Sequence, residues 1–204
     1  MKALFFALLA SALIIACSSE EEVPMDHVDY DATEIAEDRA AKDELFRGES
    51  SPIPADARAN FSGLRYYPPD ESYAVLAWVE PFAKPDTVTI LTTRGDDPRR
   101  ALRVGTLQFT VKGRKGTLVG YQFVDGSDMN QWFIPFADAT TGKETYSVGR
   151  YLEILAVDEA DSVLLDFNRA YSPYCAYNSD YSCPLVPAEN RLTMAIRAGE
   201  KTWK

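Results

Sequence analysis

The sequence contains a single histidine, His27, and only three cysteines. A Ser-His-Asp or Cys-His catalytic arrangement needs a histidine base, and many zinc sites are built on histidine ligands. Because His27 lies in an acidic N-terminal segment, outside the expected folded body, both kinds of site are excluded from that body. We expect no metal and no cofactor, so any catalysis has to use carboxylates, tyrosines, Arg, Lys or the remaining cysteines.

The chain also lacks a cluster of basic residues. Its formal net charge is −10, and the acidity is concentrated in residues 17–60, which hold 13 acidic and 4 basic side chains, against 18 and 16 in residues 61–204. Phosphate backbones are bound by clustered Lys and Arg, so we expect no nucleic-acid partner. An acidic segment next to anionic lipid is repelled, which would hold the body away from a membrane.

The chain has one uncharged, largely apolar run, from Ala3 to Ala16, directly after Lys2. At about 1.5 Å per residue such a run reaches about 21 Å, too short for a bilayer core of about 30 Å, and it is typical of a cleaved signal peptide. The run ends as Leu-Ile-Ile-Ala-Cys, which resembles the lipobox of bacterial lipoproteins. That resemblance implies cleavage after Ala16, a diacylglycerol on Cys17 and an envelope location anchored to the membrane by lipid. The alternative is an ordinary signal peptide with a chance cysteine.

Three segments follow from this organisation: a signal peptide (1–16), a flexible acidic tether (17–30) and a single globular domain (31–204). Residues 31–47 are expected to form a helix, because Asp31 and Glu34 are spaced as a capping box and Gly48 can supply a left-handed C-terminal residue. Its apolar stripe is thin, which predicts a peripheral position.

Residues 61–204 show the two-residue periodicity of strands. Gly105–Gly113 alternates strictly and, with 112–116 as the turn, is expected to form a hairpin with Thr117–Phe123. Further strands are expected at 73–79, 87–93, 131–136, 146–154, 163–167 and 191–198. The predicted fold is mainly β (α+β): an antiparallel sandwich or partly open barrel with one N-terminal peripheral helix. We expect a monomer.

Residues 167–191 do not have the pattern of a helix or strand, since they show no periodicity and are rich in tyrosine and asparagine. A loop of this length in a compact domain is usually functional or disordered, and disordered segments are poor in aromatic residues. Cys175 and Cys183 lie in it, seven residues apart. In an oxidising envelope they are expected to form a disulfide. A redox-active dithiol and a metal site are the alternatives.

A candidate site involves this loop and the strand before it. Asp166 and Glu189 are hypothesised as paired carboxylates, and Arg150, in an otherwise apolar strand row, as a contact to an anionic or polyhydroxyl ligand. If strands 146–154 and 163–167 pair as a hairpin, Arg150 comes close to the start of the loop. The remaining candidates are Asn168, Arg169, Tyr171, Tyr174 and Asn190. The alternative is structural: these side chains bond the backbone of the loop, and Arg150 forms a core salt bridge.

Several segments, in order and with their internal spacing, resemble the domain-of-unknown-function 1684 family: KDELF (42–46), SP (51–52), FSGLRYYPP (61–69), FIPFADATTGKETYSVGRYL (133–152), DFNRAYSPYCAYN (166–178), CPLVPAENRL (183–192) and AGEK (198–201). One departure is Ser172, where the family pattern has asparagine. The resemblance covers nearly the whole body and implies no activity.

Three functions are therefore considered. The first is an envelope module that binds a small polar or glycan-like ligand. The second is a histidine-free hydrolase or transferase that uses Asp166 and Glu189 as acid and base. The third is a purely structural envelope factor. A concave polar pocket that unites Arg150, Asp166, Tyr171 and Glu189 would favour the first two.

Overall fold

The computed structural model describes residues 30–125, 130–157 and 161–204. The predicted signal peptide, Cys17 and the tether up to residue 29 lie outside the described residues. The helices are α1 (Ala32–Arg47) and α2 (Ala55–Arg58), and the strands are β1 (Ala74–Ile90), β2 (Arg99–Val111), β3 (Arg114–Phe123), β4 (Gln131–Phe136), β5 (Arg150–Leu155) and β6 (Asp161–Asp166).

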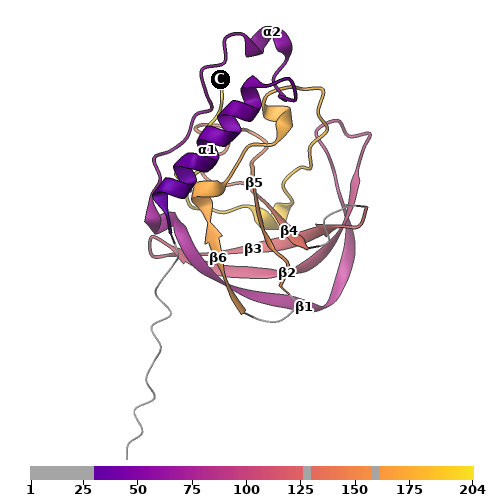
Figure 1. Ribbon diagram of the computed structural model, residues 1–204. Helices are drawn as coiled ribbons and strands as arrows, with labels where there is room; N and C mark the ends of the chain where they lie inside the picture. The colour runs from indigo at the N-terminus through magenta and orange to yellow at the C-terminus, as the bar shows by residue number, and fades with distance from the viewer. Residues whose placement is uncertain (1–29, 126–129, 158–160) are drawn as a thin grey trace, which may run out of the picture.

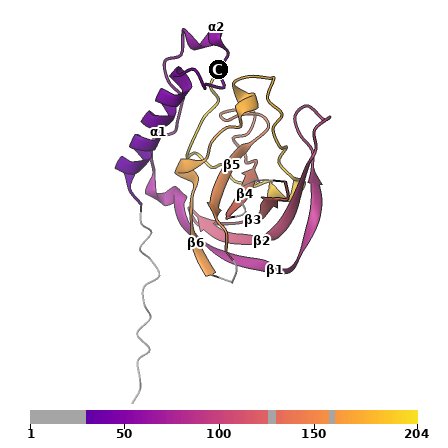
Figure 2. The ribbon, with the colours of Figure 1, turned by 45° about the vertical axis from the view of Figure 1, so that its right-hand side comes forward.

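The six strands form one antiparallel sheet in the order β5-β4-β3-β2-β1-β6, which curves into a half-barrel (Figures 1 and 2). The predicted mainly β fold is confirmed, and of its two forms the partly open barrel is the one observed. The main core includes Leu107, Leu118, Ile134, Phe136 and Phe167. Alternate residues of the central strands supply it, as expected for a sheet with one face packed inward and one in solvent.

The predicted N-terminal helix is confirmed as α1. Asp31 caps it, accepting hydrogen bonds from the backbone N–H groups of Thr33 at 2.7 Å and Glu34 at 3.3 Å. Only Ile35 and Phe46 of the helix are buried, and Figures 1 and 2 show it outside the sheet beside the end of the chain. The left-handed conformation expected at Gly48 is wrong: Gly48 has an extended conformation with φ of −73°, and its N–H bonds the carbonyls of Glu44 and Leu45.

The predicted hairpin is confirmed as β2 and β3. Val111 pairs with Arg114, so the turn consists of Lys112 and Gly113 alone. Both have positive φ, 47° and 73°, the conformation of the tight turn whose twist matches that of the flanking strands. The hairpin is therefore longer and its turn shorter than the sequence pattern suggested.

Two strand predictions are wrong in extent or pairing. Residues 73–79 and 87–93 were expected as separate strands, whereas β1 is one strand whose pairing with β2 shifts between Pro81 and Asp86. The hairpin expected between 146–154 and 163–167 is absent, because β5 pairs with β4 and β6 pairs with β1. The connection between β5 and β6 therefore joins the two outer strands of the sheet order.

The strand expected at residues 191–198 is also absent. Met194, Ile196 and Ala198 are buried in the main core, so the two-residue alternation is real. The segment nevertheless forms only isolated bridges, Ala137 with Arg191 and Tyr66 with Glu200 further on. Its backbone is held by a few hydrogen bonds to residues 137–139 and by the side chains of Arg150 and Asp138, without a regular strand ladder. Among the described residues, no helix combines the length and apolar character that a membrane span requires.

Candidate functional site

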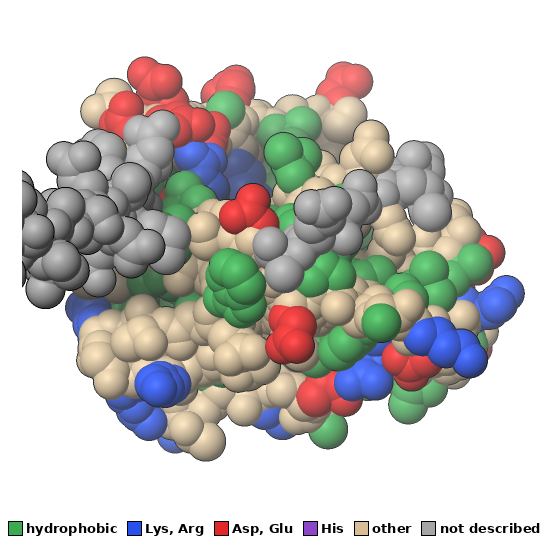
Figure 3. All heavy atoms as spheres, turned by 90° about the horizontal axis from the view of Figure 1, so that it is seen from below, with side chains coloured by type: hydrophobic (Ala, Val, Ile, Leu, Met, Phe, Trp, Pro, Cys, Tyr) green, Lys and Arg blue, Asp and Glu red, His purple; other side chains and the backbone are tan. Residues whose placement is uncertain are grey.

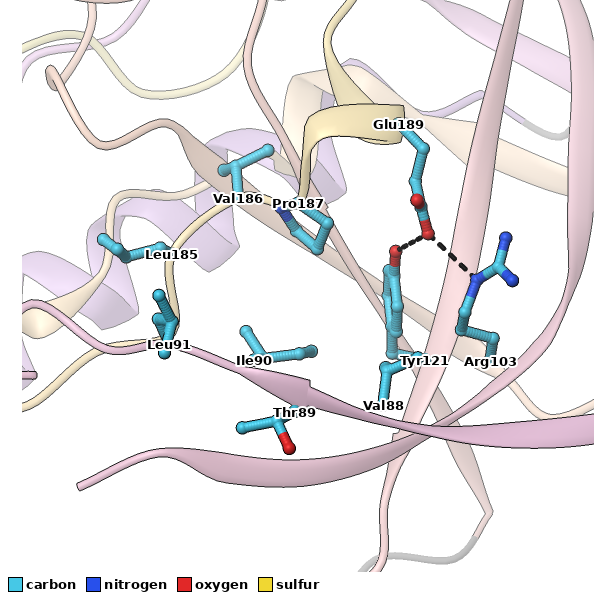
Figure 4. A pocket seen from close by; sticks show the side chains of 10 residues that line it. All are labelled: Val88, Thr89, Ile90, Leu91, Arg103, Tyr121, Leu185, Val186, Pro187 and Glu189. Carbon is cyan, nitrogen blue, oxygen red and sulfur yellow. Dashed lines mark hydrogen bonds and ion pairs between the residues drawn. The ribbon is translucent and has the colours of Figure 1, made fainter.

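A cavity of about 440 Å³ lies where the second half of β1 faces the chain segment that precedes residue 190. Six of its ten lining residues are aliphatic: Val88, Ile90, Leu91, Leu185, Val186 and Pro187. Figure 4 shows that Arg103 of β2, Tyr121 of β3 and Glu189 meet at one end. An apolar wall with a few convergent polar groups is the usual composition of a small-molecule site.

Backbone hydrogen bonds fix the 183–189 segment against the end of β1. The N–H of Leu185 donates to the carbonyl of Leu91 at 2.7 Å, and the N–H of Thr93 donates to the carbonyl of Cys183 at 2.9 Å. The aliphatic side chains of the two segments therefore face each other across the cavity.

Asn190, a predicted candidate, fixes the other end of this segment. It is fully buried, and its amide nitrogen donates to the carbonyls of Val119 at 2.9 Å and Pro135 at 2.7 Å. Its amide oxygen accepts from the N–H of Val119 at 2.8 Å. Asn190 thus replaces a missing strand partner, and it holds the neighbouring Glu189 over β3.

The polar end of the cavity is a three-residue cluster. Glu189 Oε1 accepts hydrogen bonds from the Tyr121 hydroxyl at 2.6 Å and from Arg103 Nε at 3.0 Å. Arg103 Nη1 also lies 3.4 Å from Asp86 Oδ1. Among the described residues, no partner occupies Glu189 Oε2 or Arg103 Nη2. One acceptor and one donor are therefore available to a ligand.

Two pKa shifts follow from this cluster. Burial and the bond to Glu189 raise the pKa of Tyr121, so its hydroxyl stays protonated and donates at neutral pH. Burial opposes the charge on Arg103, but Glu189 and Asp86 outweigh it and raise the pKa of Arg103. With one cation facing two carboxylates, the cluster favours a neutral or cationic head group over an anion.

Arg150, the central residue of the predicted site, is buried in the core with 1% of its side chain exposed. Its guanidinium donates to the carbonyls of Ile196, at 2.8 Å, and Ala198, and lies 3.6 Å from Asp138 Oδ2. It also lies over the ring of Phe136. Of the two interpretations open from sequence, this environment is that of the structural ion pair.

Asp166 and Asn168 connect the end of β6 to the loop before β1. Asp166 Oδ1 accepts from the backbone N–H of Asn168 at 2.9 Å and from its amide nitrogen at 2.8 Å. Asn168 exchanges two hydrogen bonds with the backbone of Asp70. The pocket that Glu189 lines does not include Asp166, so the hypothesised carboxylate pair does not share this cavity.

Three further candidates lie around α1 and the loop. Arg169 pairs with Glu34, at 3.0 Å, and Asp38, and so ties α1 to the body. Tyr171 forms a backbone bridge with Tyr151 of β5, and its hydroxyl donates to Glu153 at 2.8 Å. Tyr174 is 46% exposed and packs edge-on against Tyr181. Asn168, Arg169 and Tyr171 line one pocket beside α1, and Arg169 Nε lies 3.7 Å from Asp166 Oδ2. The structure thus brings these four predicted residues together, apart from the buried Arg150 and from Glu189 in its own cavity.

The two loop cysteines are free thiols in this structure. They lie close together, since the Cys175 N–H lies 3.1 Å from Cys183 Sγ, and the Tyr146 hydroxyl lies 3.7 Å from Cys175 Sγ. A hydrogen bond from Cys183 lowers the pKa of Cys175 to about 7. The disulfide expected from sequence is not found, and its formation under oxidising conditions stays a prediction.

Sequence reasoning missed a second buried charge, Glu200. It is fully buried, pairs with Lys42 of α1 at 2.8 Å, and accepts hydrogen bonds from the Tyr177 hydroxyl and the N–H of Ser172. Burial raises its pKa. The only signal was its place in the AGEK segment, because no periodicity marks a residue in an irregular tail.

Comparison with known proteins identifies the family of this chain and a similar solved structure. The family model described as "Protein of unknown function (DUF1684)" matches residues 59–201, more than two thirds of the chain. The chain belongs to the DUF1684 family. One match among solved structures is an uncharacterised protein of Haloarcula marismortui, determined in solution by NMR. It is 39% identical, with a TM-score of 0.66, and the match covers 83% of this chain and 93% of that chain. No curated protein matches the chain.

The DUF1684 match includes every residue that lines the cavity, whereas α1 precedes it. Because neither the family description nor the NMR structure names a ligand or a reaction, the function of this DUF1684 protein has to be argued from its site.

Proposed function

We propose that this protein binds a small amphipathic ligand, with an apolar body and a hydroxyl- or amine-bearing head, in the cavity at Glu189, and that it does so as a lipid-anchored protein of the cell envelope. One observation carries the ligand proposal: an aliphatic cavity ends in a cluster that keeps one acceptor and one donor unoccupied. Such groups orient a ligand whose body is held by apolar contact.

The charge of the cluster supports the choice of head group. Asp86 and Glu189 together outweigh Arg103, and both already lie within 3.4 Å of its guanidinium. An anionic head would meet two carboxylates, whereas an amine or hydroxyl can donate to Glu189 Oε2. A glycan requires more polar contacts than this cavity offers, since six of its ten lining residues are aliphatic.

The pocket is tested with three matched amphiphiles, n-octylamine, 1-octanol and octanoate. They are titrated by calorimetry against the mature chain carrying Cys17→Ser, expressed without residues 1–16 so that it takes no lipid. We expect octylamine to bind most tightly and octanoate most weakly. Glu189→Gln removes the negative charge but keeps an acceptor for Tyr121, so octylamine should bind about tenfold more weakly.

Glu49→Gln is the matched control, because Glu49 is an exposed carboxylate on the loop after α1. It should leave the three affinities unchanged. Equal binding of all three amphiphiles, or octylamine binding that is insensitive to Glu189→Gln, would reject the proposed role of the cluster.

The anchor is supported by the uncharged run from Ala3 to Ala16 and by the cysteine that follows it. Two or more acyl chains hold a protein stably on a membrane, whereas a single chain does so only marginally. Cys17→Ser should therefore leave an unprocessed precursor or release a soluble form, as read by fractionation and intact mass. A mutant protein that is still processed and membrane-bound would contradict lipidation at Cys17.

A further inference from the structure

The outer face of the half-barrel carries an exposed tryptophan. Trp78 lies within β1 and is 50% exposed, although its neighbours Ala77 and Val79 are fully buried. Because side chains alternate along a strand, Trp78 points away from the core into solvent. A single exposed hydrophobic residue is common on protein surfaces, so the groups that surround Trp78 decide whether it belongs to a binding surface.

Hydrogen-bonding side chains flank Trp78 in register across four strands. Trp78 pairs with Ser162 of β6 on one side and with Gln108 of β2 on the other, and Gln108 pairs with Thr117 of β3. At a strand spacing of about 4.8 Å this row is roughly 14 Å long. The Gln108 amide nitrogen donates to Glu80 at 3.4 Å, and its amide oxygen accepts nothing from the described residues.

The row lies in a shallow depression of about 610 Å³. The lining of the depression includes the row formed by Trp78, Gln108, Thr117 and Ser162. It also includes Leu76, Thr110 and the charged Lys115. Figure 3 shows the molecule from the side of β1, where uncharged and hydrophobic side chains lie beside a few acidic ones and basic side chains lie toward the margin. The surface thus offers one exposed indole ring and several hydroxyl and amide groups, with Lys115 and the Glu80 carboxylate beside them.

We propose that this outer face, centred on Trp78, is a binding surface for an uncharged polysaccharide. A pyranose ring presents a C–H face that packs on an indole and a rim of hydroxyls that exchange hydrogen bonds with hydroxyl and amide side chains. The row supplies both in one line across the sheet. This site is separate from the cavity at Glu189 and does not depend on it.

Other occupants fit this surface less well. Nucleic acid and anionic lipid need several cations, and Lys115 is the one cation among the described residues that line the depression. A protein partner would need a larger apolar centre than Trp78 with Leu76 and the partly exposed Leu164. The uncharged hydrogen-bonding groups favour a hydroxyl-rich ligand.

The test uses the mature chain carrying Cys17→Ser, with cellohexaose and chitohexaose titrated by calorimetry and insoluble cellulose and chitin used for retention. We expect binding to at least one of these glycans. Trp78→Ala should weaken it about tenfold or more, and Trp78→Phe less, because a smaller aromatic ring remains. Gln108→Ala should weaken it by a smaller factor.

Tyr181→Ala is the matched control, since Tyr181 is an aromatic residue that is 37% exposed near the opposite end of β1. It should bind as the wild type does, and thermal melts should show all variants folded. The proposal is overturned if no glycan binds the wild type, or if Trp78→Ala binds equally well. It is also overturned if Trp78→Ala instead abolishes binding to anionic vesicles or self-association.

Discussion

Arg150→Ala is expected to lower the free energy of unfolding by about 3 to 5 kcal/mol. The guanidinium holds the irregular C-terminal segment by donating to the carbonyls of Ile196 and Ala198, and it lies beside the buried carboxylate of Asp138. Its removal leaves these acceptors buried without a donor, and each such group costs about 1 to 3 kcal/mol. Urea unfolding monitored by circular dichroism measures the loss.

Two variants sharpen this result. Arg150→Lys should recover only part of the stability, because an ammonium cannot reproduce the planar fork of donors that reaches several carbonyls. Arg99→Ala is the matched control: its side chain is 47% exposed and pairs with Asp97 on the surface, so the change should stay within about 0.5 kcal/mol. A loss below about 1 kcal/mol for Arg150→Ala would contradict the structural role and return the residue to the list of ligand contacts.

The sequence could not decide whether Arg150 contacts a ligand or forms a structural ion pair. A charged residue in an apolar row signals a buried polar interaction, but its partners here are backbone carbonyls some 46 to 50 residues further on. Residues 191–198 show the alternation of a strand because one side packs on the core. The same alternation arises without a ladder when Arg150 and Asp138 satisfy the backbone, so periodicity alone predicted a strand that is absent.

Local patterns, in contrast, predicted their elements well. The capped helix α1 and the hairpin of β2 and β3 depend on residues close in sequence, and both are present. β1 was predicted as two strands because Pro81 and Pro85 usually interrupt one. The strand passes through them by shifting its register, so that extra residues of β1 bulge out opposite β2.

The cavity at Glu189 was only partly foreseeable. Glu189 was a candidate, but its partners Arg103 and Tyr121 are 86 and 68 residues away along the chain. Both partners lie on strands whose sequence shows only the alternation of a sheet. Nothing in the order of residues indicates that the loop ending at Asn190 folds back over β3. That placement depends on the buried amide of Asn190 and on the pairing of Leu185 with β1, which are long-range contacts.

The second large effect is expected at the ion pair between Lys42 and the buried Glu200. Lys42→Met should cost about 3 kcal/mol at pH 7, because it leaves the fully buried carboxylate of Glu200 without its cation. Lys143→Met, an exposed lysine, is the control and should have little effect. Urea unfolding at several pH values gives the free energies.

The stability of the protein should depend on pH through the titration of Glu200. Burial raises the pKa of Glu200, so the folded protein binds this proton more tightly than the unfolded chain does. The contribution of this group to stability is therefore fully present below its ordinary pKa and declines as the pH rises through the raised one. Without Lys42 the pKa rises further, and the loss caused by Lys42→Met should shrink on acidification.

The double variant Lys42→Met, Glu200→Gln separates charge from packing. The glutamine oxygen can accept from the N–H of Ser172, and its amide can donate to the Tyr177 hydroxyl, so the interior stays bonded without a charge. We expect it to regain at least half of the stability lost in Lys42→Met and to lose the pH dependence of the single variant. A double variant as unstable as Lys42→Met at pH 7, with the same slope against pH, would show that the cost comes from lost side-chain packing and not from an unpaired Glu200 carboxylate.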